Sequence, residues 1–207
     1  MGAKILENGS TYFYEHSGRE NFLKTIEIVK QRCEVGDTNK IFIFAATKQS
    51  VIDLSTALKN SNCKVFAVSF PYKQIFMVKR GEEAPEEVIP ETSLPEIRKK
   101  FAEIDVELVQ GVMPFEEIIL PGVSDLKTQV LIRTLELISQ GLPLCVQAAI
   151  MACDGGYAEP GEKIIVMSAD TAIVIKAAQK KWLFHPKKGI DIHEILCKPY
   201  SSRMDIS

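Results

Sequence analysis

The chain has 207 residues, of which 46% are hydrophobic and 25% charged, and its formal net charge is −2. This composition is ordinary for a globular protein with one large core, and the small net charge argues against nucleic acid or an anionic membrane as a partner. No run of about 18 apolar residues predicts a membrane-spanning helix, and no N-terminal apolar segment predicts secretion. We therefore expect a single cytoplasmic domain over residues 1–207.

The N-terminal part predicts a helix before the first long strand. Apolar residues recur at helical spacing over residues 19–33, and Gly36 is placed to end that helix. Three aromatic residues, Tyr12, Phe13 and Tyr14, precede it. They either pack on a sheet edge or cover the ring of a ligand.

Residues 41–46 form a short apolar run rich in Ile and Phe, which predicts a strand buried on both faces. A helix follows after a polar turn, because Val51, Leu54 and Leu58 fall on one side at helical spacing. Strand, turn and helix make the first half of a βαβ unit. The free amides and the dipole at the start of such a helix favour a phosphate or a carboxylate.

The turn formed by Thr47, Lys48, Gln49 and Ser50 is the first candidate site. A lysine in the first turn of a helix opposes the macrodipole, so Lys48 makes best sense if an anion lies near it. A solvated lysine beside an ordinary threonine cap is the alternative.

Residues 64–69 and 106–109 predict the second and third strands, and the first of these completes a parallel crossover. Between them, residues 71–95 carry four prolines and a cluster of glutamates, which predicts an irregular excursion with a solvated acidic face. Ser93 and Glu96 have the spacing of a capping box that opens a short helix.

The C-terminal half predicts two helices, over residues 127–139 and 144–153, and then two strands, over 163–168 and 171–176. Only two residues separate these strands, so the fifth strand must return antiparallel. Ser168, Asp170 and Thr171 at this turn form the second candidate site, with a plain polar turn as the alternative. The pattern of residues 190–196 fits either a strand or a helix.

Cysteine and histidine spacing predicts no metal site. The five cysteines contain no CxxC pair, and this spacing fits neither a common zinc site nor a disulfide framework. His16, His185 and His193 are isolated from one another, and standard catalytic signatures are absent. The sequence therefore identifies no catalytic residue.

The order of these elements resembles a known family. The segments that carry the resemblance are FAATKQSVIDL, TLELISQGLPLCVQAAIMACDGGYAEPGEKIIVMS, DTAIVIKAA and EILCKP. They resemble stand-alone microbial proteins similar to the C-terminal α/β domain of pyruvate kinase. The resemblance implies a three-layer α/β/α fold with a five-stranded, mostly parallel sheet in the order 3-2-1-4-5, strand 5 being antiparallel. That order places both candidate turns at one topological switch point, where open α/β sheets bind ligands.

In pyruvate kinases this domain is regulatory, and in many of them the corresponding turn holds a phosphate of a sugar-phosphate effector. The resemblance thus implies that Thr47, Lys48, Gln49 and Ser50 form a phosphate cradle. The barrel that performs the kinase chemistry is missing, so no pyruvate kinase activity is expected. The turn before Asp170 is also shorter than in the stand-alone relatives, which implies a different outer wall for the ligand.

From these features we expect a binding or regulatory domain for a phosphorylated small molecule, such as the mononucleotide FMN. Two alternatives stay open. The first is an FMN-dependent oxidoreductase, because doubly wound sheets place that cofactor at the same switch point. The second is an oligomeric scaffold, since this domain helps to build pyruvate kinase tetramers, and a homo-oligomer is compatible with either.

Overall fold

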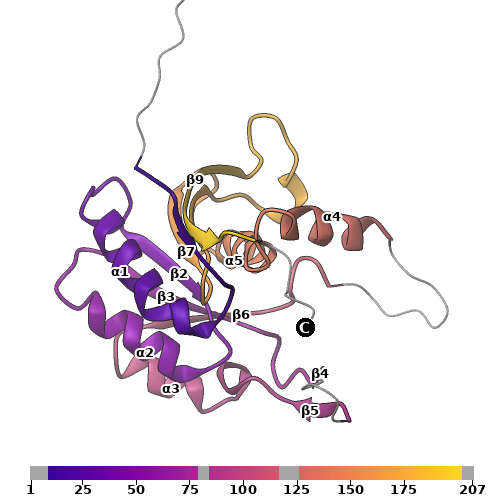
Figure 1. The fold of residues 1–207 in the computed structure, drawn as a ribbon. Helices are drawn as coiled ribbons and strands as arrows, with labels where there is room; N and C mark the ends of the chain where they lie inside the picture. The colour runs from indigo at the N-terminus through magenta and orange to yellow at the C-terminus, as the bar shows by residue number, and fades with distance from the viewer. Residues whose placement is uncertain (1–8, 79–83, 117–125, 202–207) are drawn as a thin grey trace, which may run out of the picture.

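The computed structural model describes residues 9–78, 84–116 and 126–201 (Figure 1). Its centre is a seven-stranded sheet in the order β1-β9-β8-β7-β2-β3-β6. The strands are β1 Tyr12–Tyr14, β2 Lys40–Phe44, β3 Lys64–Ser69, β6 Glu107–Gln110, β7 Lys163–Met167, β8 Ala172–Lys176 and β9 Asp191–Pro199. β8 pairs antiparallel with both of its neighbours, and all other neighbouring pairs are parallel.

The sheet is larger than the five strands that the resemblance implied. The five predicted strand segments correspond to β2, β3, β6, β7 and β8, while β9 and β1 extend the sheet beyond β8. β1 is the aromatic run near the N-terminus, and it pairs through contacts such as Tyr12 with Cys197. A pairing between such distant residues leaves no local pattern in the sequence, so β1 was not predicted as a strand. For residues 190–196 the pattern left strand and helix open, and the structure shows the strand β9.

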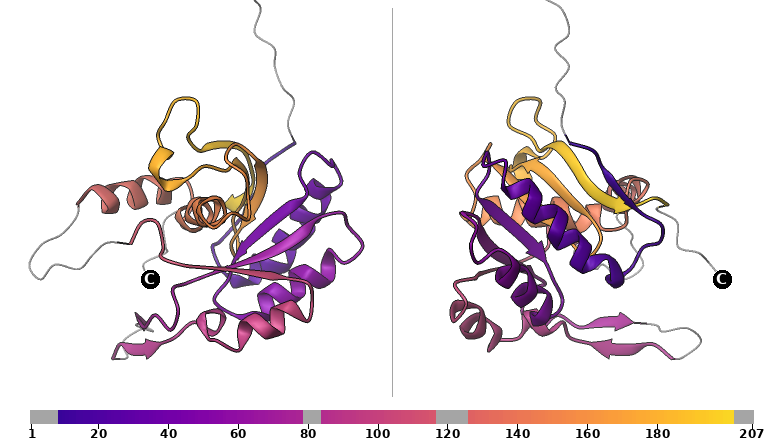
Figure 2. Two further views of the ribbon diagram at one scale, coloured as in Figure 1. Left: turned by 180° about the vertical axis from the view of Figure 1, so that it is seen from behind. Right: turned by 60° about the vertical axis from the view of Figure 1, so that its left-hand side comes forward.

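Helices cover both faces of the sheet, which makes three layers (Figures 1 and 2). One face carries α1 Phe22–Cys33, α2 Lys48–Ala57 and α3 Ile97–Ala102, which pack with Ile41 and Ile43 of β2. The other face carries α5 Leu142–Asp154 and α4 Leu126–Glu136, and Phe42 and Phe44 pack there. Alternate residues of β2 are thus buried on opposite faces, as expected of a central strand in a covered parallel sheet.

Residues 71–95 are more ordered than predicted. β4 Phe76–Val78 pairs antiparallel with β5 Glu86–Val88, and a short helical turn, η2 Glu91–Ser93, follows. Residues 79–83 of this segment lie outside the described residues. The expected capping box is also wrong, because the Ser93 hydroxyl donates to the Pro90 carbonyl at 2.8 Å and α3 begins only at Ile97.

The strand directions define one edge of the sheet at which a ligand can bind. Since only β8 is reversed, the carboxyl ends of β2, β3, β6, β7, β9 and β1 all lie along this carboxyl edge. After β6 the chain returns through α5 to β7, on the other side of β2. The topological switch point therefore lies between the carboxyl ends of β2 and β7. Among the helices of the described ranges, none has the length and apolar character needed to cross a bilayer.

Candidate functional site at the carboxyl edge of the sheet

The start of α2 holds an anion that belongs to the protein itself. Glu91 Oε2 accepts the backbone N–H of Lys48 at 3.0 Å, and Glu91 Oε1 lies 2.7 Å from Lys48 Nζ. The glutamate thus takes one unpaired amide at the helix terminus and the positive charge beside it. Burial alone would raise the pKa of Glu91, but the two hydrogen bonds from Lys48 outweigh it and lower that pKa.

Glu91 is brought to Lys48 by a well-anchored turn. Thr92, the next residue, is fully buried, and its hydroxyl donates to the Ala45 carbonyl at 2.6 Å. The Thr92 amide donates to the Ala46 carbonyl at 3.3 Å, and the Ser69 hydroxyl donates to the Thr92 hydroxyl at 2.8 Å. These contacts fix the backbone of η2 against the carboxyl ends of β2 and β3. The Glu91 side chain is therefore the part of this turn that is able to move.

The other residues of the first candidate turn surround this ion pair. Thr47 is the N-cap of α2 with extended backbone angles, but its hydroxyl makes no capping bond to the helix amides. Instead, Thr47 Oγ1 and Ser50 Oγ lie 3.0 Å apart. Gln49 points outward and donates to Asp53 Oδ1 at 2.7 Å. Two hydroxyls thus lie in the first turn of the helix beside Lys48, and Gln49 is occupied elsewhere.

The second candidate turn is packed inside the protein. Ser168 and Thr171 are both buried, and the Ser168 amide donates to the Thr171 carbonyl at 2.8 Å. Thr171 Oγ1 lies 2.6 Å from Ser139 Oγ at the approach to α5. Asp170 accepts the Gly18 amide at 3.0 Å with one oxygen and the Thr171 hydroxyl at 3.2 Å with the other. These contacts join the β7–β8 turn to α5 and to the segment before α1.

The two candidate turns follow neighbouring strands, yet they offer different surfaces. β2 and β7 pair directly, so their carboxyl ends are adjacent. Lys48 and Glu91 retain 41% and 35% exposure of their side chains, which makes this pair accessible to a solute. Ser168 and Thr171 have almost no exposure. Of the two turns predicted from the sequence, the first is therefore the more accessible one, and Lys48, Thr47 and Ser50 are its members nearest to Glu91. Gln49 is exposed but bonds to Asp53, and Asp170 is only partly buried.

The aromatic run does not lie beside this site. β1 is separated from β2 by three intervening strands, which corresponds to about 19 Å at the usual strand spacing. Tyr12 and Phe13 are half exposed, and the Tyr14 hydroxyl lies 2.8 Å from Thr25 Oγ1. The aromatic residues thus pack on the sheet edge, which was the alternative to covering a ligand ring.

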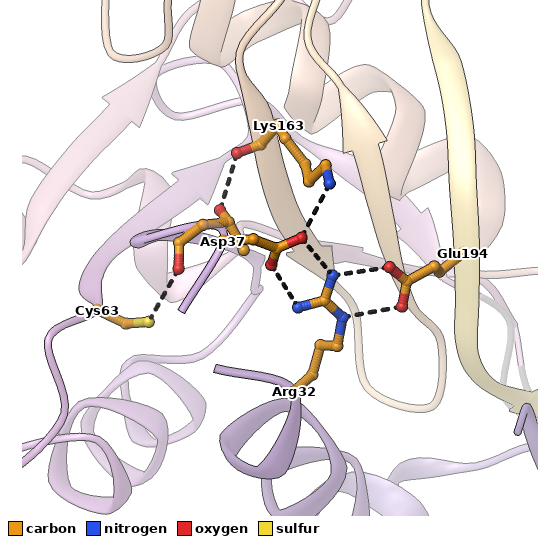
Figure 3. Close-up of polar contacts among 6 residues, drawn as sticks. Arg32, Asp37, Cys63, Lys163 and Glu194 are labelled. Carbon is orange, nitrogen blue, oxygen red and sulfur yellow. Dashed lines mark hydrogen bonds and ion pairs between the residues drawn. The ribbon is translucent and has the colours of Figure 1, made fainter. Parts of the chain in front are cut away.

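A second polar cluster lies at the opposite, amino edge of the sheet (Figure 3). Arg32, at the end of α1, donates to both oxygens of Glu194 at 2.7 and 2.8 Å and to Asp37 Oδ1 at 2.7 Å. Lys163 Nζ lies 2.9 Å from the other Asp37 oxygen, and the Lys163 carbonyl accepts the Thr38 hydroxyl. The cluster therefore connects α1, the loop before β2, β7 and β9.

The charges of this amino-edge cluster stabilise one another. The hydrogen bonds from Arg32 and then Lys163 hold the pKa of Asp37 well below its usual range. The hydrogen bonds to Glu194 and then Asp37 raise the pKa of Arg32. Every charge in the cluster is matched by an opposite charge in good geometry, so we assign it a structural role.

Glu91 is the one residue of the carboxyl-edge site that the sequence did not reveal. It lies 43 positions from Lys48 and follows an acidic, proline-rich segment that predicted only a solvated face. The anomalous lysine at the start of α2 was the available signal, because it indicated a nearby anion without identifying it. In the described part of the chain, no group of three or more His, Cys, Asp or Glu side chains is arranged to hold a metal ion. No protein-family model matches the chain.

Proposed function

We propose that the protein is a binding or regulatory domain whose ligand is a small phosphorylated molecule bound at the start of α2. The observation that carries this proposal is the Glu91 carboxylate on Lys48. The amide and the ammonium group of Lys48 already bind an anion, at an accessible position beside the switch point. A phosphate entering here would take the place of the glutamate side chain.

A phosphate should compete successfully with the Glu91 carboxylate for Lys48, because of its charge and its number of oxygens. A phosphate monoester carries nearly two negative charges and three acceptor oxygens, whereas a carboxylate carries one charge and two oxygens. The additional oxygen is matched by the hydroxyls of Thr47 and Ser50, which lie within hydrogen-bonding distance of each other. The anchored backbone of η2 allows Glu91 to leave by side-chain rotation alone. Ligand binding is then coupled to release of this internal contact, which gives a domain of this kind a regulatory response.

The ligand class that we favour is a mononucleotide, with FMN as the first to be tested. This choice rests on the resemblance to the pyruvate kinase C-terminal domain and on the general position of such ligands at switch points. Co-purified flavin is detected by its yellow colour and visible absorbance. A protein that carries no flavin and does not bind added FMN excludes FMN but leaves the phosphate site to be tested with other phosphates.

Calorimetric titration with inorganic phosphate tests the site directly. Glu91→Gln removes the competing charge and should strengthen phosphate binding by roughly tenfold. Ser50→Asp places a fixed negative charge beside the proposed phosphate position at the start of α2. It should weaken phosphate binding by roughly 30-fold, about 2 kcal/mol. Glu87→Gln, an exposed glutamate on β5, is the matched control and should bind like the wild type. If both site variants melt normally and bind phosphate like the wild type, the ligand's phosphate does not bind at the start of α2.

A further inference from the structure

The connection between β8 and β9 forms a basic, aromatic loop, which we define as residues 180–188. Its sequence, KKWLFHPKK, contains four lysines, two aromatic residues and one histidine but no acidic residue. Because β8 is the reversed strand, the loop that follows it begins at the amino edge of the sheet. It is therefore remote from Lys48 and independent of the function proposed above. Figure 1 shows this loop beside α4.

Backbone and side-chain contacts hold the loop in a defined shape. The Gly189 amide donates to the His185 carbonyl at 2.8 Å, and the Ile190 amide donates to the Leu183 carbonyl at 3.2 Å. His185 Nδ1 accepts the amides of Lys187 and Lys188, each at 3.1 Å. The His185 ring also packs edge-on against Trp182, with ring centroids 5.3 Å apart. The four lysines thus belong to a loop whose conformation is held by these hydrogen bonds and by the contact between the two rings.

Positive charge gathers around the single tryptophan of the chain. Lys181 Nζ and Lys188 Nζ each lie 5.2 Å from the centre of the Trp182 ring. The Trp182 ring attracts both ammonium groups through its quadrupole and so holds two positive charges close to it. None of the four loop lysines forms an ion pair with any residue in the described ranges. The charge of these lysines is therefore not neutralised by an acidic side chain of the described ranges and is available to a bound anion.

A hollow beside the loop offers space for the rest of such a ligand. Its volume is about 460 Å³, which lies within the usual range for small-molecule sites, roughly 300 to 1,000 Å³. Trp182, Phe184, Lys180 and Lys181 line one side, and Phe115 and Leu131 line the other. The Phe115 wall is fixed, because its amide donates to Gln147 Oε1 of α5 at 2.9 Å. Phe184 is 80% exposed, so its ring is accessible to a ligand in the hollow.

We propose that this hollow binds a small aromatic molecule bearing a phosphate, of the nucleoside monophosphate class. The aromatic and aliphatic walls suit a planar ring, and Lys180 and Lys181, the two loop lysines that line the hollow, suit the phosphate. The concave shape favours a small molecule over a membrane surface, for which a protruding contact is needed. Tight binding requires a ligand with both groups, because a ring alone leaves the lysines without an anion and a phosphate alone leaves the apolar walls without a contact.

Because Trp182 is the only tryptophan, its fluorescence reports on this hollow directly. AMP is the probe, adenosine supplies the ring without charge, and inorganic phosphate supplies the charge without the ring. We expect AMP to change the emission saturably and to bind at least roughly tenfold more tightly than either control. Absence of a saturable AMP signal up to the millimolar range, or equal binding of inorganic phosphate, overturns the proposal.

Charge and ring contributions are separated by variants that spare the tryptophan. The double substitution Lys180→Gln/Lys181→Gln removes both lysines that line the hollow and should weaken AMP binding by roughly tenfold or more, and Phe184→Ala should also weaken it. Lys59→Gln/Lys99→Gln removes the same charge from exposed positions elsewhere and should leave binding unchanged. Equal loss in both double variants would mean that only net charge matters and would refute a specific site.

Two further measurements give independent outcomes. Ser50→Asp should leave the AMP-induced change of Trp182 emission intact, and loss of that change in this variant would place the ligand elsewhere. Sedimentation tests whether the hollow is instead covered by a second copy of the chain. A dimer that Phe184→Ala dissociates, together with no effect of AMP, would overturn the small-molecule proposal.

Discussion

Glu91 and Lys48 meet through two contacts, a backbone hydrogen bond of 3.0 Å and an ion pair of 2.7 Å, although 43 positions separate them in the chain. The lysine alone is unfavourable at the start of a helix, and the glutamate alone is a carboxylate on a small turn. Together they neutralise each other and satisfy one helix amide. This relationship makes the start of α2 an anion site whose present occupant is part of the protein.

The contribution of Glu91 to folding should depend on pH. Its pKa is lowered in the folded protein, so its stabilisation is present above the unfolded pKa of about 4.3 and is lost as pH falls through the folded value. At neutral pH and without added anions, we expect Glu91→Gln to cost about 1 kcal/mol of unfolding free energy. Urea unfolding at pH 7 and at pH 3 measures this difference, which should shrink at the lower pH. A difference that grows at pH 3 would contradict the ion pair.

The stabilisation that Asp37 contributes at the amino edge of the sheet should also decrease as the pH falls. Arg32 and Lys163 depress its pKa, so its stabilisation is fully present above about pH 4 and is lost on acidification. Since its side chain is 36% exposed, Asp37→Asn should cost only about 1 kcal/mol at pH 7. Thermal melts across pH 3 to 7 check this, with Glu34→Gln as an exposed control on the same loop. Equal melting of Asp37→Asn and wild type at pH 7 would show that the cluster contributes nothing to stability.

Gly141 occupies a position where a side chain does not fit. A Cβ atom there would lie 2.4 Å from Ser168 Oγ and 2.6 Å from Thr171 Oγ1, which are both buried. The backbone angle of Gly141 is normal for alanine (φ −79°), so steric overlap is the sole penalty. We expect Gly141→Ala to cost about 1–3 kcal/mol of unfolding free energy. Gly111→Ala is the control, because no atom lies within 4 Å of the position that its Cβ would take, and it should cost far less. Equal losses of unfolding free energy in the two variants would show that the β7–β8 turn adjusts freely.

Thiol labelling should distinguish the five cysteines. Cys63 is partly exposed, whereas the other four are buried, and burial raises the pKa of each of these four. For Cys153, with a pKa of about 11, roughly one thiol in a thousand is ionised at pH 8. Mass spectrometry after brief alkylation should therefore find the label on Cys63 first, and Cys63→Ser should abolish the fast phase. Early labelling of Cys145 in the native protein would show that the core around α5 opens.

Elements with a local signal could be predicted from the sequence. The apolar runs that became β2, β3 and β7 and the helical spacing of α1, α4 and α5 depend on neighbouring residues, so they were predicted close to their observed limits. The two-residue separation of β7 and β8 likewise dictated an antiparallel return, because no crossover fits in it. Lys48 was also conspicuous in the sequence, since its charge conflicts with the helix dipole.

Contacts between residues far apart in the chain became visible only in the folded protein. The strand β9 pairs with β8, and β1 then pairs with β9 at residues 12–14, which lie far from β9 in the sequence. Thr171 looked like a site residue as a member of a polar turn, yet packing against Ser139 makes it part of the core. Lys48 was predicted to need an anion, and the folded chain supplied Glu91. A local pattern indicates which secondary structure or which charge a residue favours. Its contact partner depends on how distant segments are brought together when the chain folds around a common core.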